Sequence, residues 1–135
     1  VISLENYCKT IVIEANTMVS MARTEIAPAI EAYLTEIAKA AMTKKELDPT
    51  LPRTYETELI QKLSTLTVQI AARTDELEQA VLDLEQAVSM EAYAIRDSIL
   101  PKMCQLRLPC DEAETLTARK YWPFPTYGDL LFGVN

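Results

Sequence analysis

Histidine is absent from the 135-residue sequence, and glycine occurs only at positions 128 and 133. Without histidine, the chain lacks the commonest general base and the commonest protein ligand for zinc, copper and iron. Without glycine-rich segments, it lacks a loop whose backbone N–H groups could cradle a phosphate. We therefore expect no catalytic residue, no cofactor-binding residue and no metal ligand in this chain.

Cysteine is also scarce. Cys8, Cys104 and Cys110 are an odd number of thiols at irregular spacing. This pattern is typical of reduced thiols in a cytosolic protein rather than of a disulfide framework, and it does not form a zinc-binding cluster. We assign these residues no chemistry.

Basic residues are outnumbered, with 13 Lys and Arg against 20 Asp and Glu, which gives a formal net charge of −7. Nucleic-acid binding requires clustered positive charge, so we expect no nucleic-acid partner. The sequence also has no apolar run long enough to span a bilayer and no signal peptide at Val1, so we expect no membrane partner. These features predict a cytoplasmic fragment of a larger protein.

The composition favours helices. Hydrophobic residues make up 49% of the chain, which is enough for one folded domain over residues 1–135. Alanine, leucine and glutamate are abundant, whereas the turn residues that a sheet would need are rare. The fold class that this composition predicts is all-α.

Apolar residues recur every three or four positions from Leu4 to Ala41, which predicts one helix over about residues 3–42. Pro28 lies inside this stretch and predicts a bend near Thr24–Pro28. The segment 43–54 contains Asp48-Pro49 and Pro52, so we expect a loop there that reverses the chain.

A second apolar stripe predicts a helix over about residues 55–87, interrupted only by the polar pair Arg73-Thr74. The stripe consists of Leu59, Leu63, Leu66, Ile70, Leu77, Val81, Leu84 and Val88. A third helix is expected over about residues 90–119, bent at Pro101 and Pro109. Together these elements predict an elongated antiparallel bundle of about three long, partly kinked helices.

Residues 120–135 form an irregular tail that holds five of the nine aromatic residues. The proline pair in this tail prevents continued helix, and exposed aromatic side chains would form an apolar patch. The tail is therefore either a clasp on its own bundle or a docking surface. Its candidate structural or docking residues are Tyr121, Trp122, Pro123, Phe124, Pro125, Tyr127, Leu130, Leu131 and Phe132.

Arg107 and Asp111 are four residues apart on the third predicted helix, where they could form a salt bridge. Alternatively, they anchor the aromatic tail. The carboxylate pairs Asp111 with Glu114 and Asp75 with Glu78 share a helix face and could bind Mg²⁺ weakly, but such pairs are usually just solvated surface.

Three ordered motifs carry a family resemblance. They are M-x-x-L-R at residues 103–107, D-E-x-E at 111–114 and Y-W-P-F-P-T-Y-G-D-L-L-F at 121–132. In this order and at these separations they closely resemble the C-terminal end of type III glutamine synthetases. Helical segments upstream, including Met18–Met21 and Ile99–Met103, are similar to the same family. Pro109 and Cys110 depart from the pattern.

The resemblance implies the C-terminal helical module of an enzyme that joins ammonia to glutamate at the expense of ATP. Upstream domains would carry that chemistry together with ATP and Mg or Mn. The module's implied partners are the upstream catalytic domain of the same polypeptide and other subunits of a homo-oligomer, with a structural or subunit-assembly role. The alternative function from the residues alone is a free-standing helical adaptor or regulatory protein that binds a partner helix.

Overall fold

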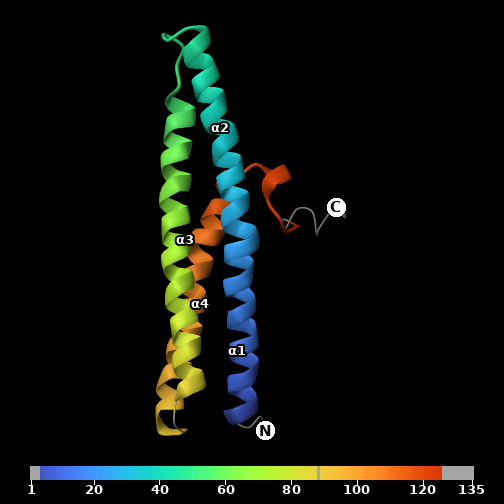
Figure 1. Ribbon diagram of the computed structural model, residues 1–135, viewed down its shortest axis with the longest axis vertical. Helices are drawn as coiled ribbons and strands as arrows, with labels where there is room; N and C mark the ends of the chain where they lie inside the picture. Colours follow the sequence, from blue (N-terminus) through green and yellow to red (C-terminus); the bar gives the residue numbers. More distant parts are fainter. Residues whose placement is uncertain (1–3, 88, 126–135) are drawn as a thin grey trace.

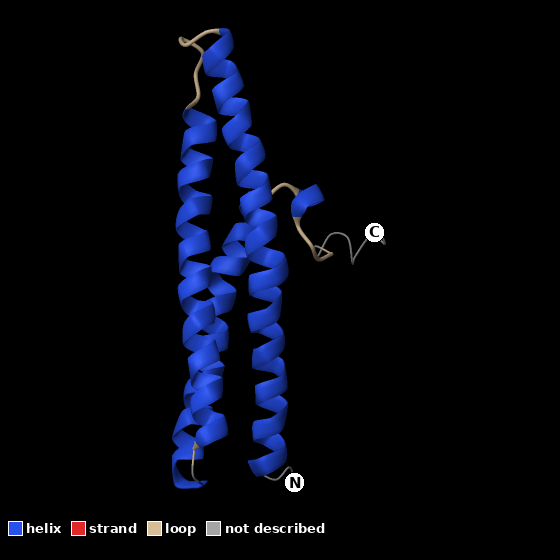
Figure 2. Ribbon diagram, in the orientation of Figure 1, coloured by secondary structure: helices blue, strands red, loops and turns tan. Residues whose placement is uncertain are grey.

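The computed structural model describes the backbone of residues 4–87 and 89–125, and the side chains of residues 9–87 and 91–125. All of the regular structure in this described part is helical (Figure 2). The chain runs along one edge of an elongated molecule, reverses, runs back, and reverses again (Figure 1). The prediction of an all-α, elongated antiparallel bundle is confirmed.

The first helical stretch comprises α1 (Leu4–Met21), a π-helical turn η1 (Ala22–Ile26) and α2 (Ala27–Leu47). In η1, the Ala27 N–H donates to the Ala22 carbonyl, five residues back. In a regular α-helix the ring of Pro28 would crowd the carbonyl four residues before it, and the wider π turn relieves this contact. The helix therefore continues through Pro28 without a break. Its irregular turn, η1, overlaps the Thr24–Pro28 region in which the sequence predicted a bend.

The connecting loop is shorter than the sequence predicts. It occupies residues 48–53 rather than 43–54, because α2 extends to Leu47. Lysines 44 and 45 lie in the last turn, where positive charge favours a helix C-terminus. Asp48 ends the helix in an extended conformation just before Pro49, and its side chain accepts a hydrogen bond from the Thr50 N–H at 3.0 Å.

Helix α3 (Thr54–Gln86) forms the centre of the molecule and packs against α1, α2 and α4. All the described residues of its predicted stripe are buried; Val88 lies outside the described residues. The sequence predicted an interruption of this stripe at Arg73-Thr74, but Thr74 does not interrupt it. Its side chain is buried, and its hydroxyl donates to the Ile70 carbonyl at 2.6 Å, which satisfies the polar group within the helix.

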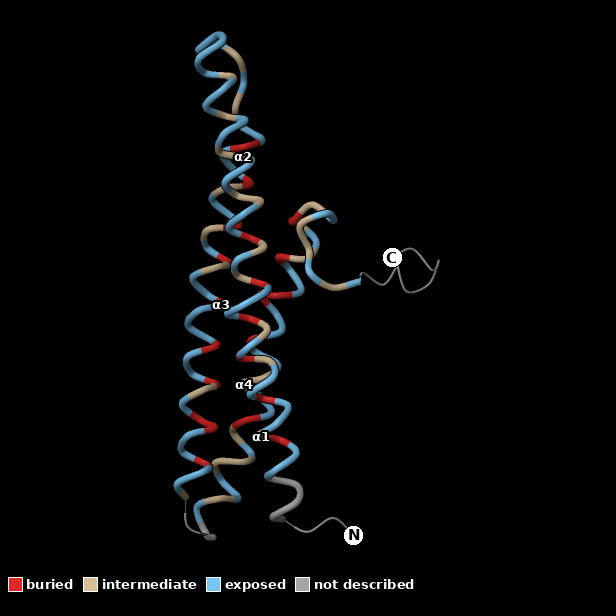
Figure 3. The backbone as a smooth tube through the Cα atoms, turned by 45° about the vertical axis from the view of Figure 1, so that its right-hand side comes forward, coloured by how far each residue is buried: buried red, intermediate tan, exposed pale blue. Residues whose placement is uncertain are grey.

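Helix α4 (Ser89–Leu116) contains Pro101 and Pro109 and packs against α3 and α1. It ends three residues earlier than predicted. A 3₁₀ turn, η2 (Arg119–Tyr121), follows, so the beginning of the tail is not entirely irregular. The buried residues of the helices face one another along the bundle axis (Figure 3). Helices α2 and α3 extend past the end of α4 as a two-helix arm (Figure 1).

Candidate functional site

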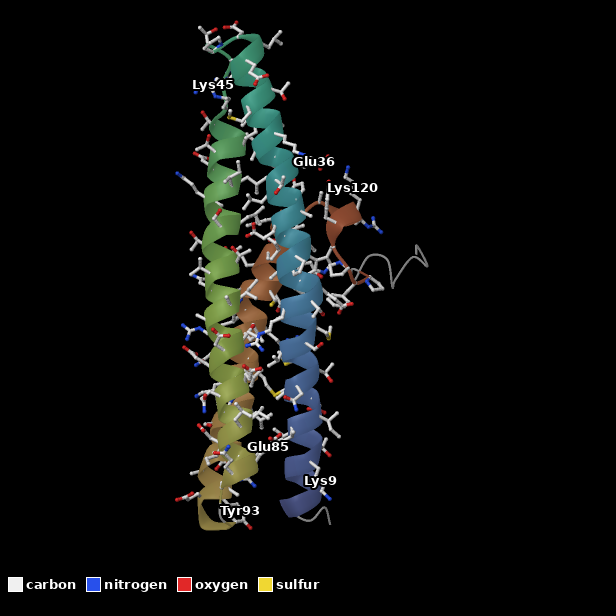
Figure 4. All side chains as sticks on the ribbon, viewed as in Figure 1. Lys9, Glu36, Lys45, Glu85, Tyr93 and Lys120 are labelled. Carbon is white, nitrogen blue, oxygen red and sulfur yellow. The ribbon has the colours of Figure 1, made fainter. Side chains whose placement is uncertain are left out.

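The described part of the tail folds back on the bundle through η2. We call residues Thr117–Pro125 the strap. The rings of Tyr121 and Tyr33 of α2 lie 5.5 Å apart, and Lys120 Nζ lies 3.5 Å from Glu36 Oε1 (Figure 4). A hydrogen bond with Glu36 raises the pKa of Tyr121. The strap is thus held against α2 by a tilted aromatic contact, an ion pair and a hydrogen bond.

Beyond η2, Trp122 and Phe124 are half-buried and pack against the hydrophobic core. Pro123 and Pro125 are exposed. Trp122 Nε1 is covered and makes no hydrogen bond within the described residues. The other predicted tail residues, Tyr127, Leu130, Leu131 and Phe132, lie outside the described part of the chain.

The two strap aromatics help to line a partly open cavity of about 260 Å³. We call it the strap cavity. One wall comes from α1 and η1, and the other comes from α4. The other apolar lining residues are Met18, Met21, Ala22, Ile26, Leu106 and Cys110. Methionine side chains adapt their shape to what they contact, so the α1 wall can accommodate different apolar groups.

Charged side chains form the rim of the strap cavity. Arg107, Asp111 and Glu114 of α4 all border it. Arg107 and Asp111 are exposed, and within the described residues they do not form the ion pair that their spacing makes possible. Their position beside Trp122 and Phe124 is compatible with the alternative that they anchor the tail, which stays a prediction.

Cys110 forms part of the cavity wall. Burial raises the pKa of its thiol to about 11, and the neighbouring Asp111 carboxylate adds to this effect. The thiol is therefore neutral at physiological pH and contributes an apolar surface. Cys104, one turn and a half earlier in the same helix, is exposed.

Sequence reasoning missed several residues of this region. The pairing of Tyr33 and Glu36 with the strap joins positions more than 80 residues apart, which no local pattern reveals. The sequence also gave no indication that Met21 and Cys110 line a cavity. The available signal was the aromatic content of the tail, which showed that apolar surface elsewhere had to receive it.

A separate ion-pair cluster joins η1 to α3. Arg23 Nη2 lies 2.8 Å from Asp75 Oδ1 and 3.0 Å from Glu78 Oε1. The hydrogen bond from Arg23 lowers the pKa of Glu78. Asp75 and Glu78, which sequence reasoning weighed as a weak Mg²⁺ pair, thus share a guanidinium instead. Within the described residues, no group of three or more Cys, Asp or Glu side chains is arranged to hold a metal.

The lowered pKa of Glu78 predicts an acid-sensitive contribution to stability. The contribution is complete above the pKa of an unfolded glutamate, about 4.3, and disappears as the pH falls through the lower folded value. Glu78→Gln should therefore melt below the wild type at pH 7, and the difference should shrink toward pH 3. Thermal melts followed by circular dichroism at both pH values measure this.

Glu85→Gln is the matched control, since Glu85 is an exposed carboxylate on the same helix (Figure 4). It should melt like the wild type at both pH values. An equal difference between Glu78→Gln and the wild type at pH 7 and pH 3 would contradict the role of the Arg23 contact.

Comparison with known proteins shows what the chain is similar to. A sequence model described as the glutamine synthetase C-terminal domain matches residues 1–45. A glutamine synthetase from Butyrivibrio fibrisolvens is 31% identical over 137 residues, which cover 99% of this chain and 19% of that protein. The chain is thus similar to the C-terminal part of glutamine synthetases. A type-3 glutamine synthetase from Dictyostelium discoideum is 25% identical over 139 residues, covering 97% of this chain and 19% of the relative.

The resemblance to type III glutamine synthetases is thus confirmed. The chain spans about a fifth of the length of the two relatives and aligns with their C-terminal part. No solved structure gives a significant match. Among the described residues, no helix combines the length and the apolar character that a membrane span requires.

Proposed function

We propose that this chain is the non-catalytic C-terminal helical module of a type III glutamine synthetase, with a structural or subunit-assembly role. The full polypeptide would join ammonia to the side-chain carboxylate of glutamate with ATP hydrolysis in the cytoplasm. Its upstream domains would bind ATP and Mg or Mn. The observation that carries the proposal is the alignment, which spans nearly all of this chain but only a fifth of each relative.

The shape of the bundle supports an assembly role. The α2–α3 arm projects past α4 and carries the exposed apolar side chains of Met42, Leu47 and Tyr55. At its end, Lys44 makes an ion pair with the buried Glu56 carboxylate, which holds the two helices together. The ion pair fixes the two helices of the arm to each other, and the arm exposes apolar side chains to solvent. Such a surface is typical of a contact with another domain or subunit, here the catalytic domain or another subunit of a homo-oligomer.

The test begins with the native polypeptide, captured from its source with an antibody against Tyr121–Asn135. Because the chain spans 19% of each relative, we expect an intact mass about five times 15.2 kDa and ATP-dependent glutamine formation in the same fraction. A mass near 15.2 kDa without this activity would contradict the proposal and favour the free-standing adaptor.

The assembly role needs a second measurement. The full-length enzyme and a version lacking residues 1–135 are compared by native mass and by glutamine formation. We expect the shortened protein to form smaller assemblies. An unchanged native mass would reject the assembly role while leaving the identity of the module intact.

A further inference from the structure

We propose that the strap cavity binds a small organic cation, an apolar body that carries one ammonium group. The apolar body lies between the walls that α1, η1 and α4 form, and the ammonium group lies at the charged rim. Three features point to this ligand: the volume of the cavity, its lining, and the balance of charge at its rim. The site is independent of the proposed enzyme activity.

The volume of the cavity sets the size of the ligand. An apolar cavity of about 150 Å³ holds one benzene ring, and the strap cavity measures about 260 Å³. It therefore has room for one ring with a short chain, which is the size of phenethylamine. Pockets for drug-sized ligands measure about 300–1,000 Å³, so the ligand is smaller than these.

The lining of the cavity suits an apolar body with a positive end. Met18 and Met21 supply flexible thioether side chains that adapt to irregular apolar shapes. Trp122 and Phe124 supply aromatic rings, which pack against apolar groups and also attract cations. Apolar contact alone gives no preference for a charge, so the aromatic rings and the rim decide which end group is favoured.

The rim of the cavity carries one net negative charge at neutral pH. Its charged side chains are Arg107, Asp111 and Glu114, which are two carboxylates and one guanidinium. None of the three makes an ion pair within the described residues, so the carboxylates are open to a ligand. A ligand with a single positive charge balances this rim, whereas an anion would increase its negative charge.

The negative charge of the rim acts on the cavity wall. Burial is the main cause of the raised pKa of the Cys110 thiol, and the neighbouring Asp111 carboxylate adds to it. The carboxylate therefore disfavours a negative charge in this part of the wall. By the same interaction it favours a positive charge held nearby. The cavity should thus prefer a cation to a neutral molecule or an anion of similar size.

Trp122 reports binding directly, because it lines the cavity and is the single tryptophan of the chain. The 135-residue chain is titrated with phenethylamine, with its neutral isostere 2-phenylethanol and with the anion phenylacetate, and tryptophan fluorescence is followed. For phenethylamine we expect a saturable change with half-saturation at about 1 mM or below. Binding of 2-phenylethanol should be about three- to fivefold weaker, the effect of one exposed charge pair, and phenylacetate should bind most weakly.

Substitutions at the rim should change amine binding in opposite directions. Asp111→Asn and Glu114→Gln each remove a negative charge, so each should weaken phenethylamine binding by about two- to fivefold. Arg107→Gln removes the positive charge and should strengthen it by a similar factor. The binding of uncharged 2-phenylethanol should stay the same in all three variants. Helix content by circular dichroism must match the wild type for each variant compared.

Glu112→Gln is the matched control for the rim carboxylates. Glu112 lies on the same helix, but it lines separate cavities that also involve Gln69 of α3. The substitution removes the same charge from α4 without changing the rim of the strap cavity. Phenethylamine should therefore bind this variant as it binds the wild type, and a loss equal to that of Glu114→Gln would overturn the assignment of the site.

Cys110 locates the ligand independently of fluorescence. Its thiol lies in the cavity wall, whereas Cys104 on the same helix is exposed. Saturating phenethylamine should slow the alkylation of Cys110 by iodoacetamide and leave the rate at Cys104 unchanged. Tryptic peptides separate the two thiols, since trypsin cuts between them at Arg107. A fluorescence change without protection of Cys110 would place the amine elsewhere and overturn the site.

The absence of a saturable fluorescence change with phenethylamine would overturn the proposal. Equal binding of phenethylamine and 2-phenylethanol would also overturn it, because the cavity would then select only for apolar surface. Amine binding that weakens as the chain concentration rises would overturn it by identifying a second copy as the occupant. Preference for the amine that follows the rim substitutions, together with protection of Cys110, supports the cation site.

Discussion

Replacing Leu77 with alanine is expected to lower the free energy of unfolding of the 135-residue chain by about 2–5 kcal/mol. Leu77 is 0% exposed and lies in the C-terminal half of α3, which packs against all three other long helices. Removing its side chain takes apolar surface out of the core and leaves a cavity that rigid helices fill poorly. Urea denaturation followed by circular dichroism at 222 nm measures the change.

Leu82→Ala is the matched control, because it removes the same atoms from the same helix at a position that is 43% exposed. We expect it to change stability by less than about 1 kcal/mol. If the two substitutions had equal effects, the assignment of Leu77 to the core of the bundle would be wrong.

Replacing Trp122 with alanine is expected to destabilise the chain by about 1–3 kcal/mol. A fully buried tryptophan would give about 3–5 kcal/mol. Trp122 is only half-buried, and its covered Nε1 has no hydrogen-bond acceptor within the described residues, which reduces its net contribution. Thermal melts by circular dichroism measure the effect, since Trp122 is the single tryptophan and its loss abolishes the intrinsic indole fluorescence.

Tyr55→Ala serves as the comparison, because Tyr55 is an aromatic residue that is 69% exposed on the arm. Its melting temperature should stay within a degree or two of the wild type. A Trp122→Ala chain that melts at the wild-type temperature would show that the strap does not stabilise the bundle and would leave Trp122 as a contact for another domain or subunit.

Periodicity predicted α3 well because the helix is long and its apolar residues face a single core. Local chemistry explains where the sequence was misleading. Thr74 looked like a polar interruption, but a threonine hydroxyl can satisfy itself on the carbonyl four residues back and then be buried. The loop was expected too early because Lys44 and Lys45 resembled loop residues, although both are good helix formers.

The strap cavity could be predicted only in part. The sequence showed that Trp122 and Phe124 needed an apolar surface, and that Arg107 and Asp111 lay near the tail. It could not show that Met18 and Cys110 form opposite walls, because these residues come from helices whose packing depends on the whole bundle. The cavity results from the packing of helices that are distant in sequence, and no local sequence pattern in either wall predicts it.

The π turn accommodates one residue more than regular helical turns would hold between the first and last buried positions of the first helical stretch. Among the side chains described in this stretch, six are buried: Ile11, Ala15, Val19, Ala22, Ile26 and Ile30. From the first to the last, they advance nineteen positions in five turns. Five regular turns of 3.6 residues hold eighteen. The surplus residue is absorbed between Ala22 and Ile26, so the inward face stays aligned on both sides of it. Losing a residue here would keep the inward face aligned, although Pro28 would again meet the carbonyl four residues before it. The same loss elsewhere would rotate one half of the core face by about 100° away from its neighbours.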